Sequence, residues 1–179
     1  AGFASANDDL AEAMLPCVRV GRYGGASGVM VALDDDYGYG LSVAHARGEA
    51  RTQKAVGIGT VKGVTVQGEW LASDDEHDLA LFRIPAKDVI SIAPVAQELP
   101  SNGNWRLIGY PETRGPKVVT LRFQDAVVNG HVPKSPRWQS TVVSGVCGSG
   151  DSGAPTLNDK HEVIGIMSHG IDGKVSQCS

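Results

Sequence analysis

Residues 148–155 read GSGDSGAP and hold the most specific signal in the chain. Ser152 lies in a run of small residues, which lets the backbone turn sharply and bring several of its N–H groups together. A turn of this kind can form an oxyanion hole, a set of donors that stabilises a developing negative charge. A serine hydroxyl becomes a strong nucleophile only when a base accepts its proton, and that base must itself be oriented. The stretch therefore predicts a nucleophilic serine and directs the search to a histidine and an acid.

Both residue types occur upstream in suitable settings. His45 ends the apolar run of residues 41–46, LSVAHA, and Asp78 begins the apolar run of residues 77–82, HDLALF. Both runs are typical of buried strands. A polar group at the end of a rigid strand can be directed into a cleft, so we expect His45 and Asp78 to share a cleft with Ser152.

The order of these blocks separates the folds that carry such residues. An α/β-hydrolase has a GxSxG stretch and the order serine, acid, histidine, and subtilisin-like enzymes have the order aspartate, histidine, serine. Here the order is histidine, aspartate, serine, and Ala154 stands where GxSxG has its second glycine. The blocks SVAHA, DLALF and GDSGAP resemble the signatures of the chymotrypsin-like (trypsin-fold) serine peptidases. The short spacings between them resemble compact bacterial or viral-type members.

The resemblance implies a role for each of these residues. Ser152 is expected to be the nucleophile, His45 the general base and then the general acid, and Asp78 the buried acceptor that fixes the imidazole tautomer. The N–H groups of Gly150 and Ser152 are expected to form the oxyanion hole. The expected function is that of a serine endopeptidase, which hydrolyses peptide bonds through an acyl-enzyme on Ser152.

The resemblance also implies where a substrate binds. A strand downstream of the nucleophile pairs with the substrate backbone in this family, and Ser168, His169 and Gly170 stand where that strand is expected. His169 replaces the usual aromatic residue.

The specificity pocket is expected to reject basic side chains. Its floor is either Gly145 or Val146, and Met167 lies beside the substrate strand. None of these is acidic, so an Arg or Lys side chain would lose its hydration without gaining a carboxylate partner. We expect apolar or small side chains before the cut bond, with a minor place for acidic ones through His169.

The three cysteines are expected to form one disulfide. The resemblance pairs Cys147, before the nucleophile, with Cys178, after the substrate strand, as in many relatives in which such a bond braces this site. A disulfide favours a secreted or extracellular location. Cys17 receives no functional role and is expected to be a buried small residue or an exposed thiol.

The strand pattern predicts an all-β fold of two packed, six-stranded antiparallel β-barrels, with a short N-terminal helix over residues 6–15. Elsewhere, short apolar runs with a two-residue period are bounded by glycine or polar residues. Residues 60–68 and residues 117–128 are each expected to form one strand. The single peptidase domain, residues 1–179, then consists of an N-terminal helical segment (1–16), a first β-barrel (17–84), a connector (85–104) and a second β-barrel (105–179).

Composition limits the partners. The chain has 179 residues, of which 41% are hydrophobic and 20% charged, and a formal net charge of -4. This acidic balance argues against nucleic acid or an anionic membrane surface, and no apolar stretch reaches the roughly 20 residues of a membrane helix. We expect a protein or peptide substrate and no membrane insertion. The cysteines and histidines lack the spacing of metal ligands, and the serine endopeptidase implied by the resemblance needs neither a metal nor an organic cofactor. The oligomeric state is left open.

Two other functions stay open at this stage. The first is a binding protein of the same fold whose catalysis is impaired, because the family continues past the second cysteine with a further strand and helix whereas this chain stops at Ser179. The second is a processing protease released from a longer precursor.

Overall fold

The computed structural model describes residues 6–21, 25–47, 55–98, 104–110, 117–122, 126–129, 140–144, 150–171 and 175–178. Helix α1 (Ala6–Met14) begins this part of the chain, and the predicted N-terminal helix is thereby confirmed. None of the described helices has the length and apolar character needed to cross a membrane.

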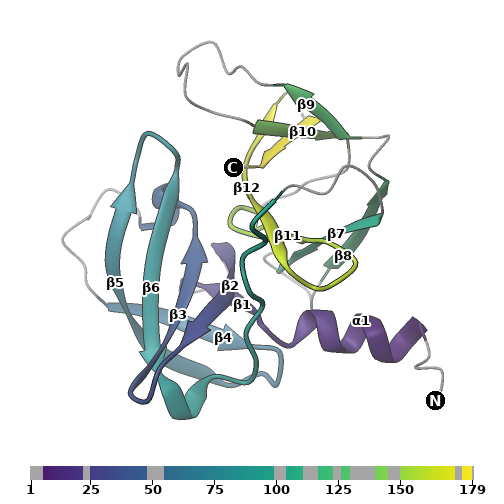
Figure 1. Ribbon diagram of the computed structural model, residues 1–179. Helices are drawn as coiled ribbons and strands as arrows, with labels where there is room; N and C mark the ends of the chain where they lie inside the picture. The colour runs from purple at the N-terminus through teal and green to yellow at the C-terminus, as the bar shows by residue number, and fades with distance from the viewer. Residues whose placement is uncertain are drawn as a thin grey trace.

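The first half is a closed antiparallel barrel, drawn at the left of Figure 1, with the strand order β1-β2-β3-β6-β5-β4. β1 pairs with both β2 and β4, which closes the barrel and leaves no sheet edge. The predicted first barrel of six strands is confirmed. Its strands are β1 (Cys17–Val20), β2 (Ala26–Leu33), β3 (Tyr37–Ser42), β4 (Ala55–Thr60), β5 (Thr65–Asp74) and β6 (Leu79–Pro85).

The barrel is built by alternation of buried and exposed positions. Along β6 every second residue is buried, which directs Phe82 and Ile84 inward. Trp70 meets the Phe82 ring edge-on, with ring centroids 5.8 Å apart. Opposite them, a Cβ at Gly40 would lie 2.2 Å from the Phe82 ring, so the large aromatic residue fits only because position 40 has no side chain.

The second half, at the upper right of Figure 1, is one antiparallel sheet with the order β8-β7-β11-β12-β13-β10-β9. The predicted second six-stranded barrel is not confirmed, because the described residues of this half form a sheet of seven strands rather than a closed barrel. The pairings recorded among the described residues place β8 and β9 at the two ends of the sheet. The strands are β7 (Asn104–Gly109), β8 (Lys117–Arg122), β9 (Ala126–Asn129), β10 (Ser140–Ser144), β11 (Pro155–Leu157), β12 (Val163–Ile171) and β13 (Val175–Cys178).

Two predicted strands are each divided in the structure. Residues 60–68 contain the hairpin turn between β4 and β5, at which Gly63 has a φ of 76°. Residues 117–128 contain all of β8 and the first three residues of β9. Strand β13 was not predicted, because its four residues, VSQC, have too little apolar character to indicate a strand.

A shared core joins the two halves. It contains Val29 and Val43 from the barrel, Ile108 and Leu157 from the second half, and Ala13 from α1. Five consecutive residues of β2 are buried, because one face of this strand fills the barrel and the other packs in the shared core. The relative placement of the halves is therefore set by packed apolar side chains.

Candidate active site

His45 and Asp78 meet because two neighbouring strands of the barrel run antiparallel. β3 ends at Ser42, which pairs with Ala80 near the start of β6. The chain therefore leaves β3 at the same barrel edge at which it enters β6. Asp78 directly precedes β6, and His45 lies on the short 3₁₀ helix η2 (Ala44–Arg47), so the prediction that His45 ends a strand was wrong by a few residues.

Three contacts hold this histidine and this acid together. His45 Nδ1 lies 2.8 Å from Asp78 Oδ2, and the His45 N–H donates to Asp78 Oδ1 at 3.0 Å. The N–H of Ala44 donates to the carbonyl oxygen of Asp78 at 3.1 Å. Asp78 makes these contacts with a φ of 51°, in the left-handed region that aspartate tolerates better than most residues.

The surroundings of Asp78 favour its charged form. Burial is the largest influence and raises the pKa, but hydrogen bonds from the His45 ring, the Ser168 hydroxyl and the His45 N–H outweigh it, so the pKa lies below that of an ordinary aspartate. An ionised carboxylate can only accept hydrogen bonds, so Nδ1 of His45 must carry a proton. In the neutral ring this leaves the lone pair on Nε2, which is the atom a general base needs. The His45 side chain is 43% exposed and thus within reach of a substrate.

The turn around the predicted nucleophile Ser152, residues 150–154 and hereafter the nucleophile turn, has a conformation that requires glycine. Gly150 and Gly153 have φ values of 93° and 84°. A Cβ at Gly153 would lie 2.0 Å from the carbonyl oxygen of Ser27, so no other residue fits there without a shift of the backbone. The Gly153 N–H donates to the carbonyl of Met167 on β12 at 2.7 Å.

Ser168 on β12 connects this turn with Asp78. Its buried hydroxyl donates to Asp78 Oδ2 at 2.6 Å, and its carbonyl oxygen accepts a hydrogen bond from Ser152 Oγ at 3.4 Å. An O–H···O contact of 3.4 Å is weak, so it restrains the Ser152 hydroxyl only slightly. The structure thus brings Ser152, Ser168, Asp78 and His45 into one connected group.

Two groups at this site were not predicted from the sequence. Ser168 was expected only to bind substrate, but its hydroxyl contacts Asp78. Ser27 had no predicted role, but its hydroxyl and backbone both contact the nucleophile turn. A serine in an apolar strand carries no local signal for either contact, because the partners of each serine are distant in sequence.

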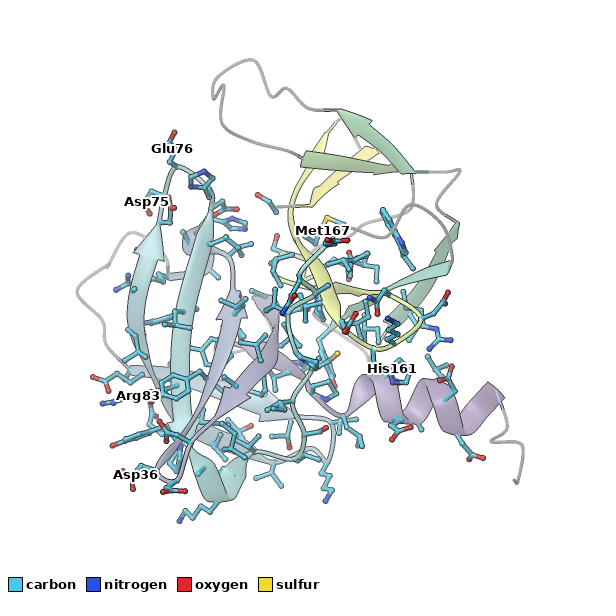
Figure 2. The ribbon with its side chains drawn as sticks, viewed as in Figure 1. Asp36, Asp75, Glu76, Arg83, His161 and Met167 are labelled. Carbon is cyan, nitrogen blue, oxygen red and sulfur yellow. The ribbon has the colours of Figure 1, made fainter. Side chains whose placement is uncertain are left out.

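Other predicted site residues are only partly described. Met167 lies on β12 in the second half (Figure 2) and is almost fully buried. The predicted pocket floor and disulfide both stay predictions, because Gly145, Val146 and Cys147 lie outside the described residues and only the backbone of His169, Gly170 and Cys178 is described.

Of the two expectations for Cys17, a buried small residue or an exposed thiol, the structure confirms the first. The Cys17 side chain is fully buried, its thiol donates to the carbonyl of Ala13 at 3.5 Å, and burial raises its pKa. Within the described residues, no three histidine, cysteine, aspartate or glutamate side chains gather in a way that could hold a metal ion.

Solved structures share this fold across nearly the whole chain. A serine endoprotease from Yersinia pestis superposes with a TM-score of 0.73 at 20% sequence identity, and the aligned region covers 99% of this chain and 63% of that one. The HtrA-type protease AlgW with a tripeptide gives a TM-score of 0.78 at 16% identity, covering 98% of this chain and 59% of that one. An inactive serine-to-alanine mutant from Mycobacterium tuberculosis gives 0.71 at 15% identity, covering 99% and 89%. The chain thus spans about three fifths of the first two proteins.

Sequence comparison identifies the family. Residues 26–166 match the trypsin-like peptidase domain, and this span includes His45, Asp78 and Ser152. The matched residues make up most of the chain, and the superposed structures have the same fold. This chain therefore belongs to the family of trypsin-like peptidase domains.

Proposed function

We propose that this chain is a serine endopeptidase that hydrolyses peptide bonds in protein substrates through an acyl-enzyme on Ser152. The observation that carries the proposal is the 2.8 Å contact between His45 Nδ1 and Asp78 Oδ2. Ser168 connects this pair with Ser152, because its hydroxyl donates to Asp78 and its carbonyl accepts a hydrogen bond from the Ser152 hydroxyl. The contact with Asp78 holds the imidazole in one orientation and one tautomer, as a base that activates a serine requires. A binding protein of the same fold has no need of these contacts.

The first half of the reaction forms the acyl-enzyme. Ser152 Oγ attacks the carbonyl carbon of the cut bond while its proton passes to Nε2 of His45. The N–H groups of Gly150 and Ser152 stabilise the negative oxygen of the tetrahedral intermediate. Asp78 stabilises the imidazolium without accepting its proton. The bond between carbon and nitrogen then breaks, and the leaving amine takes the proton from His45.

The second half releases the acid product. A water molecule takes the place of the amine, gives a proton to His45 Nε2 and attacks the acyl carbon. The bond to Ser152 Oγ breaks, and the serine recovers its proton from His45. The pKa of Asp78 lies below the usual aspartate value, so the carboxylate stays charged throughout the cycle near neutral pH.

Covalent labelling tests the proposal without a known substrate. A fluorophosphonate probe reacts with serine hydroxyls that a base has activated. After labelling and digestion, mass spectrometry is expected to find the adduct on Ser152. Ser152→Ala is expected to abolish labelling and the cleavage of denatured casein, whereas Ser149→Ala, at the other serine of the same stretch, retains both. An adduct on Ser149 or Ser168 contradicts the assignment, and a wild-type chain without any adduct favours the binding protein.

A further inference from the structure

Ser27 lies on β2 in the first barrel, yet its hydroxyl and its N–H both donate to the nucleophile turn of the second half. It is fully buried, at 0% exposure. We propose that Ser27 is a positioning residue that holds the nucleophile turn in the conformation required by the oxyanion hole. The inference rests on the proposed function of Ser152, because it concerns the rate of that same reaction.

Ser27 uses its side chain and its backbone for this purpose. Its hydroxyl donates to the carbonyl of Gly150 at 2.7 Å and accepts a hydrogen bond from the N–H of Tyr110 at 2.8 Å. Its own N–H donates to the carbonyl of Ser152 at 2.6 Å. A separate hydrogen bond within the barrel runs from the Ser42 hydroxyl to the Ser27 carbonyl at 2.7 Å.

The two carbonyls that Ser27 holds lie on either side of the Ser152 N–H along the backbone. The Gly150 carbonyl belongs to the peptide plane that ends at Asp151, and the Ser152 carbonyl belongs to the plane that ends at Gly153. The peptide plane between them carries the N–H of Ser152. Peptide groups are planar and rotate as units, so fixing both neighbouring planes limits the rotation of this donor.

The restraint from Ser27 adds to a hydrogen bond within the turn, from the Ala154 N–H to the Asp151 carbonyl at 2.9 Å. Gly150 and Gly153 both have positive φ, at 93° and 84°, and glycine moves between backbone conformations more readily than any other residue. Hydrogen bonds to a rigid strand can offset this freedom. β2 is suited to the task, since it is hydrogen-bonded to β1 and β3 and packs on both faces.

Removing a hydroxyl that only stabilises the fold should have a different effect on the reaction rate from removing one that positions the turn. Ser27→Ala removes the hydroxyl contacts to Gly150 and Tyr110 but keeps the N–H contact to Ser152. Ser42→Ala is the matched control, because it removes a fully buried hydroxyl from the same cluster that makes no hydrogen bond to the nucleophile turn. Both variants are expected to lose stability to a similar extent, and only Ser27→Ala is expected to lose rate.

The rate test uses the fluorophosphonate probe and p-nitrophenyl acetate. A displacement of about 1 Å at a reacting group can lower a rate about 100-fold, so we expect Ser27→Ala to label about 10- to 100-fold more slowly than wild type. The loss is expected in kcat rather than KM, and the shape of the pH profile should stay that of wild type, because His45 and Asp78 are untouched. The proposal is overturned if Ser27→Ala is labelled at the wild-type rate, or if Ser42→Ala loses as much labelling rate as Ser27→Ala.

Amide hydrogen exchange tests the restraint independently of activity. Ser27→Ala is expected to accelerate exchange at Tyr110, whose acceptor is removed, and at Gly153, whose bond to Met167 depends on the turn. Ser42→Ala should leave the Gly153 exchange near its wild-type rate. If wild type takes up no probe, the proposed function fails, while unchanged Gly153 exchange in Ser27→Ala overturns the restraint itself.

Discussion

Asp78 adopts a backbone conformation that costs free energy. A residue with a side chain at a φ of 51° is disfavoured, typically by about 1–2 kcal/mol. The cost is offset by hydrogen bonds to the carboxylate from His45 and Ser168 and by the bond from Ala44 to its carbonyl. Strain of this kind is often found where a fold must direct a functional group. Here it directs one carboxylate toward two elements, η2 and β12.

Replacing this carboxylate tests its role in orienting His45. Asp78→Asn keeps the shape of the side chain, and asparagine tolerates positive φ, so the fold should persist. The amide donates where the carboxylate accepted, which favours the wrong imidazole tautomer, and kcat is expected to fall by about 10⁴-fold. Asp74→Asn is the control, because Asp74 also contacts a histidine, His77 at 2.6 Å, in the exposed turn before Asp78. Steady-state ester hydrolysis measures both variants, and equal losses contradict the assignment.

The lowered pKa of Asp78 also predicts a dependence of stability on pH. A carboxyl group whose pKa is lower in the folded chain stabilises the fold above its ordinary value of 3.8. This stabilisation is lost as the pH falls through the folded-state pKa. In urea unfolding, the difference in free energy between wild type and Asp78→Asn is expected to shrink as the pH is lowered from neutrality to about 3. A difference that stays constant would show that Asp78 does not titrate in this way.

At the scale of elements, the strands that the sequence predicted well have a regular alternation of apolar residues. β6 is the clearest example, with every second residue buried. The turn between β4 and β5 was missed because residues 60–65, TVKGVT, are β-branched on both sides of Lys62 and Gly63, a pattern that predicts one continuous strand. The positions of His45 and Asp78 at the ends of apolar runs, together with the family resemblance, predicted that these two residues meet. The contact between Ser27 and Gly150 joins residues 123 positions apart, and no local pattern encodes it.

The missed turn can be tested with two glycines of the same hairpin. Gly63 has a φ of 76°, and a Cβ added there would meet no atom within 4 Å. Gly63→Ala is therefore expected to lower the free energy of unfolding only through the left-handed backbone conformation, by about 1 kcal/mol. At Gly57 a Cβ would make an ordinary contact of 3.8 Å, so Gly57→Ala is expected to change stability by less than about 0.5 kcal/mol. Urea unfolding of both variants gives the comparison. Equal effects would mean that backbone strain does not control this turn.

At the scale of the whole molecule, the site depends on how the two halves are joined. The barrel supplies His45 and Asp78, and the second half supplies Ser152 and Ser168. Ion pairs also link helix α1 to the second half. Asp9 on this helix lies 2.5 Å from Arg106 on β7 and 3.0 Å from His161, which Figure 2 shows beside the helix. The sequence could not predict this arrangement, since alternation within a strand shows which residues are buried but not which half covers them.

Substitutions at two fully buried isoleucines can distinguish the role of the shared core from that of the core inside the barrel. Ile108 lies in the shared core and Ile58 in the barrel core, each at 0% exposure. Truncation to alanine is expected to cost about 2–5 kcal/mol at either position. Only Ile108→Ala should also lower the rate of fluorophosphonate labelling, because a cavity between the halves shifts Ser152 relative to His45. Labelling is measured where circular dichroism shows both variants folded, and equal rates would mean that the shared core does not set the geometry of the site.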